Sequence, residues 1–215
     1  MGETSSTMKI IQPMDKESLH AARKLRRSFH TLARKILNHY ISVQKLDEIT
    51  ERLETIQNEI PAAELPKWWQ PETGSGELRS STYRNRSLYQ GPYHLFSPDL
   101  DWKEHSGPNG EEGFKFHVTL SDLYEGPPQA VHGGYIAGLF DELLGAVQSL
   151  SKTGTGYTAK LEIKYRSLTP IDEELIFAGW ILESSGRRIT VRGQCSHGEK
   201  ICSEATALFL KPNGK

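Results

Sequence analysis

Leu123 to Gly145 reads LYEGPPQAVHGGYIAGLFDELLG, and this stretch decides the fold. Gly126-Pro127-Pro128 predicts a turn, because glycine and proline punctuate regular structure. Residues 134–151 predict a helix whose apolar residues recur every three or four positions and cover nearly all of its surface. A helix that is apolar all round is normally buried, so we expect it at the centre of a domain. Its apolar residues are Tyr135, Ile136, Leu139, Phe140, Leu143, Leu144 and Val147.

The residues that begin this helix are suited to binding an anion. His132, Gly133 and Gly134 precede its first apolar turn. The first backbone N–H groups of a helix have no partner within it, and they lie at the positive end of the helix dipole. Glycine has no side chain to keep a substrate away from them. The turn is therefore a candidate oxyanion site.

Asp141 is the candidate catalytic carboxylate. It lies seven residues after Gly134, which is about two helical turns and the same face. A carboxylate on an otherwise apolar helix rarely stays buried without a partner or a purpose. We expect Asp141 to be buried and to act in chemistry.

The segments around the helix predict strands. Residues 114–120 alternate between apolar and polar side chains before it, and four further segments are rich in β-branched and aromatic residues after it. The short loops between those four imply antiparallel pairing. Such a sheet must wrap the buried helix, so the predicted class is α+β, with an antiparallel sheet around one long central helix. The four segments are Tyr157–Arg166, Glu174–Leu182, Arg188–Ser196 and Ile201–Leu210.

Residues 112–210 resemble the hotdog-fold thioesterase superfamily. His132-Gly133-Gly134, six residues and Asp141 form the H-G-G-x6-D pattern of its phenylacetyl-CoA thioesterase-like (PaaI-like) group. The preceding E-G-P-P and the later strand T-A-K-L-E-I-K-Y-R-S-L-T-P resemble the subset that includes mammalian members. The resemblance implies a hotdog fold, hydrolysis of acyl-coenzyme A and a place in fatty acid metabolism.

The resemblance also implies a role for each matching residue. Asp141 is expected to act as general base or nucleophile, and the Gly133 N–H as oxyanion donor. His132 would shape the turn, and Thr158 would position the water or the carboxylate. Gly134 and Gly126 are expected to contact substrate.

The same resemblance implies an assembly. Active sites are expected at a subunit interface, in a homodimer or a dimer of dimers. No cofactor is expected, because coenzyme A is part of the substrate, and no metal site is expected. Basic residues should hold the coenzyme A phosphates, and the candidates are Lys164, Arg166, Arg187 and Arg188.

Gly126 departs from part of the family. Many members carry Asn or Gln at this position, six residues before the histidine, where the amide helps the carbonyl or the water. This leaves open a non-catalytic acyl-CoA or small-molecule binding protein on the same scaffold. A hotdog dehydratase or hydratase is a further alternative, although its histidine-centred arrangement is not found here.

The N-terminal part predicts a helical extension. Residues 16–60 contain no Gly or Pro and show helical spacing, which predicts one helix or a bent helical pair. Its first half is basic and its second half acidic, so it either lies on a membrane surface or packs its apolar stripe on the protein. We expect the second.

The expected organisation is a helical extension over 1–60 after a loose leader at 1–14, an irregular linker over 61–111 and a hotdog domain over 112–215. The linker is expected to contain a short strand near Tyr93–Leu95. Its Trp68-Trp69 pair would pack the extension onto the domain or form a lid.

Composition narrows the function classes. The net charge of −1 gives no basic field for nucleic acid, and no apolar run is long enough to span a membrane. The N-terminus lacks a secretory signal pattern, so a cytoplasmic location is expected. Cys195 and Cys202 are too few for a disulfide framework and are expected to be reduced core residues.

Overall fold

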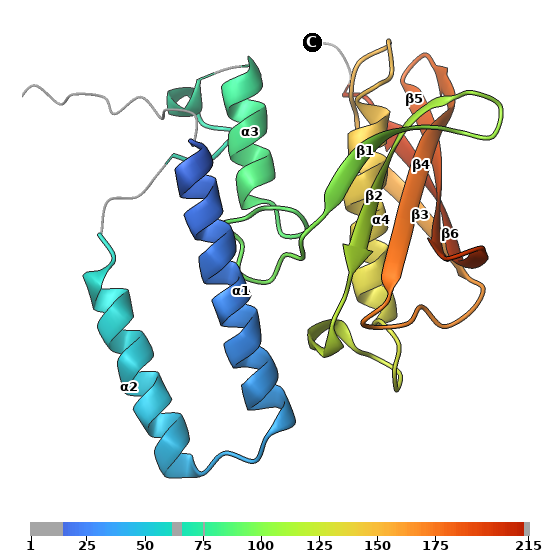
Figure 1. The fold of residues 1–215 in the computed structure, drawn as a ribbon. Helices are drawn as coiled ribbons and strands as arrows, with labels where there is room; N and C mark the ends of the chain where they lie inside the picture. The colour runs from blue at the N-terminus through green and yellow to red at the C-terminus, as the bar shows by residue number, and fades with distance from the viewer. Residues whose placement is uncertain (1–14, 62–65, 75, 213–215) are drawn as a thin grey trace, which may run out of the picture. The chain divides into compact units, whose positions relative to one another are not determined.

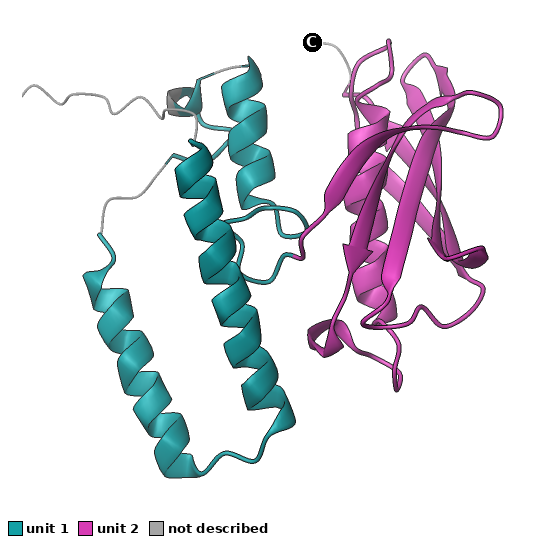
Figure 2. Cartoon of the chain, in the orientation of Figure 1, with its two compact units in different colours: residues 1–97 teal, residues 98–215 magenta. Residues whose placement is uncertain are grey.

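The computed structural model describes residues 15–61, 66–74 and 76–212, and the chain divides into two units, residues 1–97 and 98–215 (Figure 2). The expected leader at residues 1–14 lies outside the described residues. The C-terminal unit contains the segment that decides the fold. Its central helix is α4 (Gly133–Gln148), close to the expected bounds.

Six strands form one sheet around α4 (Figure 1). Every neighbouring pair is antiparallel, as expected, and the order is β1-β2-β4-β5-β6-β3. This confirms the α+β hotdog-like fold. The strands are β1 (Asp101–Ser106), β2 (Glu112–Thr119), β3 (Tyr157–Tyr165), β4 (Glu174–Ser185), β5 (Arg188–His197) and β6 (Lys200–Leu210).

Two glycines let α4 approach the sheet closely. Gly179 on β4 and Gly193 on β5 are directly paired. A Cβ atom on Gly179 would lie 3.1 Å from Leu144 Cδ2, and one on Gly193 would lie 3.0 Å from the same atom. The missing side chains leave the space that Leu144 fills, so larger residues at these positions would push the helix from the sheet.

Aromatic rings complete the core beside these glycines. Phe177 on β4 stacks on Phe116 of β2 with ring centroids 5.1 Å apart. It also meets Phe140 of α4 edge to face at 5.1 Å. All three side chains are fully buried. Ring pairs in these geometries add to the burial energy and fix how α4 lies on the sheet.

A β-bulge decides which face of β3 carries Thr158. Thr158 pairs with Phe209 of β6 and Lys160 pairs with Leu208, so Ala159 is the extra residue. Simple alternation groups Thr158 with the outward-facing polar residues of the strand. The bulge reverses that assignment and places Thr158 on the same face as Ile163 and Tyr165, which is the face toward α4.

The N-terminal unit holds α1 (Lys16–Asn38), α2 (Val43–Glu59), a short 3₁₀ turn (Pro71–Thr73) and α3 (Gly76–Arg86). The expected helical region is thus a pair of helices. The break falls at residues 39–42, where no Gly or Pro marks it in the sequence. Instead, Ser42 ends the loop by capping α2, because its side chain accepts a hydrogen bond from the Lys45 N–H.

Residues 61–111 are more regular than expected. They contain α3 and β1, and β1 is an edge strand of the sheet that starts before the expected domain boundary at 112. The strand expected near Tyr93–Leu95 is wrong, since those residues form turns. The Trp68 ring packs edge to face on Tyr83 of α3 at 5.3 Å, within the N-terminal unit.

Candidate active site

His132 caps the N-terminus of α4. Its backbone has φ −59° and ψ 129°, outside the helical region, and its Nδ1 accepts a hydrogen bond of 3.0 Å from the Gly134 N–H. Its carbonyl accepts from the N–H groups of Tyr135 and Ile136. Through these hydrogen bonds the side chain and the carbonyl of His132 hold the turn in shape.

This cap distinguishes the two glycine amides. The Gly134 N–H is used by the His132 ring. The Gly133 N–H has no acceptor among the residues that the structure describes. It lies at the first position of α4, where a donor has no partner within the helix. Of the two amides, Gly133 is therefore the one available to an oxyanion.

Gly126 lies directly against His132 in the turn before α4. A Cβ atom there would lie 2.7 Å from the Cα of His132, a distance that real side chains do not reach. The Gly126 N–H also donates to the carbonyl of Ala130 at 2.9 Å. The position that carries an amide in many members of the resembled family is thus too tight for any side chain in this chain.

Asp141 and Thr158 are brought together by α4 and β3. Thr158 Oγ1 donates a hydrogen bond of 3.1 Å to Asp141 Oδ1. Asp141 was expected to be buried, and this is wrong for the single chain, in which both residues are exposed. The sheet buries residues of α4 such as Leu139 and Leu143, whereas Asp141 bonds to the edge strand β3 and stays exposed.

Tyr165 is a residue of the site that the sequence argument missed. Its hydroxyl donates a 2.7 Å hydrogen bond to the carbonyl of Gly133. That hydroxyl would lie 3.4 Å from a Cβ atom on Gly133, so the ring covers the oxyanion turn. Leu161, Ile163 and Tyr165 alternate with charged residues in the sequence, and this alternation is a signal that Tyr165 turns toward the helix.

Asp141 and Gly133 of one chain lie too far apart to share a carbonyl group. Eight residues of helix separate them, which is about 12 Å of rise along the axis. A nucleophile and an oxyanion donor must each lie about 3 Å from the reacting group. Within one copy of α4 these two groups therefore cannot act on the same carbonyl.

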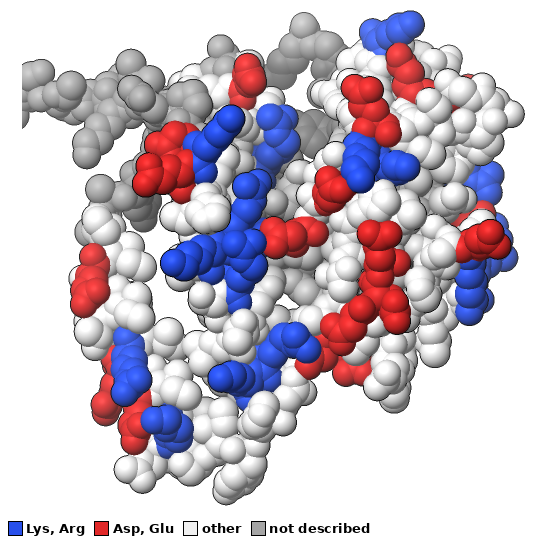
Figure 3. Space-filling model, viewed as in Figure 1, with Lys and Arg blue, Asp and Glu red and all other residues white. Residues whose placement is uncertain are grey.

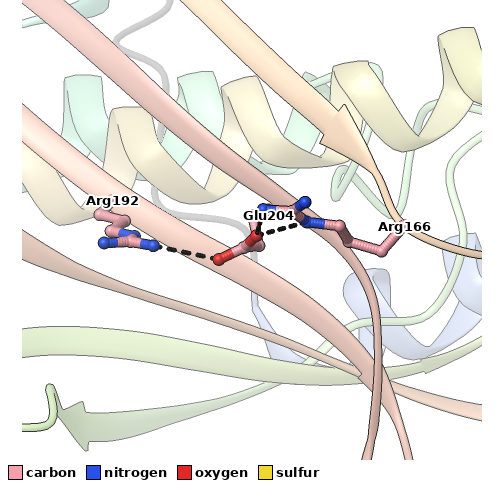
Figure 4. A network of polar contacts seen from close by, with 3 residues as sticks. All are labelled: Arg166, Arg192 and Glu204. Carbon is pink, nitrogen blue, oxygen red and sulfur yellow. Dashed lines mark hydrogen bonds and ion pairs between the residues drawn. The ribbon is translucent and has the colours of Figure 1, made fainter.

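Two of the four basic residues expected to hold the coenzyme A phosphates, Arg166 and Arg187, already bond to other groups of the chain. Arg166 and Arg192 flank Glu204 on the outer face of the sheet, at 2.6 and 3.0 Å (Figure 4). Hydrogen bonds from the two guanidinium groups hold the pKa of Glu204 below its ordinary value. Arg187 donates to the Lys211 carbonyl at 2.7 and 3.0 Å. Lys164 and Arg188 are exposed, and Lys164 lines the same hollow as Glu204.

Cys195 and Cys202 lie on the neighbouring strands β5 and β6, buried and unbonded to each other. Burial raises the pKa of the Cys195 thiol, so it stays protonated. This confirms them as core residues.

Among the described residues, no three His, Cys, Asp or Glu side chains gather in a way that could hold a metal ion. No helix in that part of the chain is both long enough and apolar enough to cross a bilayer.

The chain is similar to known thioesterases. Residues 129–201 match the thioesterase superfamily. An 89-residue stretch is 35% identical to a Xenopus laevis protein named acyl-coenzyme A thioesterase THEM4, and it covers 40% of this chain and 40% of that protein. The matched stretch therefore spans less than half of that relative. Residues 129–201, which match the thioesterase superfamily, include Gly133, Asp141, Thr158 and Tyr165.

One solved structure supports the fold. A crystal structure of a thioesterase superfamily protein superposes with a TM-score of 0.69 at 25% identity, covering 94% of this chain and 98% of that one. A Streptococcus mutans UA159 protein crystallised with acetyl-CoA gives a TM-score of 0.46 at 19% identity, over 54% of this chain and 92% of that one.

Proposed function

We propose, from the match of residues 129–201 to the thioesterase superfamily, that the chain hydrolyses an acyl-CoA thioester to a free acid and coenzyme A. The PaaI-like group is the proposed branch, because His132, Gly133, Gly134 and Asp141 fit its pattern. The observation that carries the proposal is the unused N–H of Gly133 on the same helix as the Thr158-bonded carboxylate of Asp141.

The chemistry needs few groups. Asp141 acts as the general base toward water, or as the nucleophile that attacks the thioester carbon. The Gly133 N–H stabilises the oxyanion that forms on the carbonyl oxygen. Coenzyme A leaves as a thiolate, which is a good leaving group, so a strong general acid is not required. Thr158 keeps the carboxylate pointed at the reacting atoms.

The complete site is proposed to form between two copies. The separation of about 12 Å along α4 prevents Asp141 and Gly133 of one chain from acting on one carbonyl. A second copy supplies the missing half-site, and two-fold symmetry produces two equal sites. The same contact would cover Asp141, which is exposed in the single chain.

The coenzyme A phosphates are proposed to contact Lys164 and Arg188. These two are preferred among the four basic candidates because Arg166 already pairs with Glu204 and Arg187 already binds the Lys211 carbonyl.

A panel of short, medium, long and aryl acyl-CoAs tests the activity, with Asp141→Asn as the variant. We expect turnover of at least one substrate, reduced roughly 100-fold or more in the variant. Asn keeps the size of Asp and can still accept from Thr158, so a loss reports the missing charge. Binding of an acyl-CoA without turnover, with an affinity that Asp141→Asn does not change, would instead establish a non-catalytic acyl-CoA binding protein.

A further inference from the structure

The helix α2 carries an apolar stripe that the described part of the N-terminal unit covers only in part. Five apolar residues follow one another at spacings of three and four, which is the repeat of a coiled-coil seam. None of the residues of α2 is buried. Leu53, Ile56 and Ile60 are 47%, 55% and 65% exposed. The stripe consists of Leu46, Ile49, Leu53, Ile56 and Ile60.

One face of α1 contacts other described residues of its unit. Arg26 donates a 2.8 Å hydrogen bond to Ser97 Oγ, and the Phe29 ring meets Phe96 edge to face at 5.5 Å. These contacts anchor α1 on the segment that ends the unit. A second apolar face, which includes Leu25, remains exposed.

A groove lies between the two helices near the turn that joins them. It has a volume of about 420 Å³. Leu32, Ile36 and Ile49 give it an apolar floor, and Lys35 and Lys45 give it a basic rim. A helix face with an apolar stripe and acidic flanks would complement this apolar floor and basic rim.

The chain itself contains such an element. The helix α2 has five acidic residues and two basic ones, whereas α1 has seven basic residues and one acidic one. Figure 3 shows basic side chains gathered along α1, and both acidic and basic ones on α2. Opposite charges along facing helices favour pairing and set its orientation.

We propose that the α1–α2 hairpin is a self-association surface, in which α2 of a second copy lies in the groove between α1 and α2 of the first. The exchange is reciprocal, so the contact closes by two-fold symmetry. It buries both stripes and places acidic α2 against basic α1. This interface goes beyond the proposed thioester hydrolysis and does not depend on it.

The first test is the mass of the full chain by sedimentation velocity, comparing wild type with Leu53→Asp/Ile56→Asp. We expect the mass to fall by half in this variant, because two charges enter the seam. The matched control is Thr55→Asp/Asn58→Asp, which adds the same charges on the opposite side of α2 and should keep the wild-type mass. Equal mass in all three proteins would overturn the proposal.

Charge reversal gives a second test that does not depend on packing. One variant carries Lys24→Glu, Arg27→Glu and Lys35→Glu on α1, and the other carries Asp47→Lys, Glu51→Lys and Glu54→Lys on α2. Each alone should show the lower mass, because the first variant removes the net positive charge of α1 and the second gives α2 a net positive charge like that of α1. Mixing them should restore the wild-type mass, and failure to do so would contradict the pairing.

The competing occupant is a membrane surface. Co-sedimentation with phosphatidylserine vesicles tests it on the same proteins. We expect wild type to stay in the supernatant. Binding to vesicles that is lost in Leu53→Asp/Ile56→Asp, with no change in mass, would assign the stripe to lipid and overturn self-association.

Discussion

Thr158 Oγ1 donates a 3.1 Å hydrogen bond to Asp141 Oδ1, and this bond joins the edge strand β3 to the third turn of α4. The bond exists because the bulge at Ala159 turns Thr158 toward the helix. A carboxylate that must attack or activate water needs a fixed rotamer, and Thr158 provides that restraint.

Thr158→Val should therefore lower kcat roughly 10- to 100-fold, the scale of one hydrogen bond to a charged group. Thr158→Ser keeps the hydroxyl and should retain most of the activity. Steady-state kinetics on the best acyl-CoA of the panel measures both. Similar activity in the Val and Ser variants would mean that the hydroxyl does not position Asp141.

Gly133 allows a direct test of the oxyanion donor. Proline is tolerated at the first position of a helix, and the ψ of 129° at His132 is one that a following proline allows. Gly133→Pro removes the N–H and should lower kcat/KM roughly 100- to 1000-fold. Gly133→Ala adds a Cβ atom but keeps the N–H, so it serves as the matched control. Equal losses in both would attribute the effect to crowding against Tyr165.

His132 separates a capping role from a catalytic one. His132→Ala removes the acceptor of the Gly134 N–H and should destabilise the fold by about 1 kcal/mol, with reduced activity. Asn is a good capping residue, so His132→Asn should recover both stability and activity. Thermal unfolding and kinetics are measured together. If Asn restores stability but leaves activity low, the imidazole takes part in the reaction.

The fold followed from a small number of local patterns. The all-round apolar surface of α4 and the alternating strands after it were enough to predict a sheet wrapped around a helix. The edge strand β1 was missed because Asp101–Ser106 contains four charged or polar residues besides Trp102 and His105 and buries little. An edge strand with few buried residues has almost no hydrophobic pattern to detect.

The site was predicted less completely because its geometry is not local. The pattern of glycines and a carboxylate identified Gly133 and Asp141, but not the bulge that aims Thr158. Tyr165 was missed as a site residue because its contact with Gly133 spans 32 positions in the chain. The burial expected for Asp141 failed because the neighbour that would cover it belongs to another copy in the proposed dimer.

Glu204 makes stability depend on pH. Because Arg166 and Arg192 hold its pKa below the ordinary value of 4.5, its contribution is fully present above pH 4.5 and is lost as pH falls through the lower folded value. Glu204→Gln should reduce stability at pH 7 by about 1 kcal/mol or less, because the pair is partly exposed. The difference from wild type should vanish in strong acid. Chemical denaturation at a series of pH values measures it, and a difference that persists at low pH would contradict the ionic origin.

A complementation experiment tests whether each active site is shared between two copies. Asp141→Asn lacks the carboxylate but keeps a normal Gly133, and Gly133→Pro lacks the N–H but keeps Asp141. In a mixed dimer, one site joins the intact Asp141 of one chain to the intact Gly133 of the other, and the second site carries both changes. Random exchange makes half of the dimers mixed, so activity should rise to about a quarter of wild type.

The activity must come from the mixed species and not from either parent. Each variant alone should stay near background at the same total concentration, and the gain should follow the rate at which subunits exchange. Mixing Asp141→Asn with Thr158→Val gives a control. These residues contact each other within one chain. No site of this mixed dimer therefore has both of them intact, and mixing should give no gain in activity over the two parents. A mixture of Asp141→Asn and Gly133→Pro that stays inactive, although mixed dimers are detected by mass spectrometry, would place the whole site within one chain and contradict the shared arrangement.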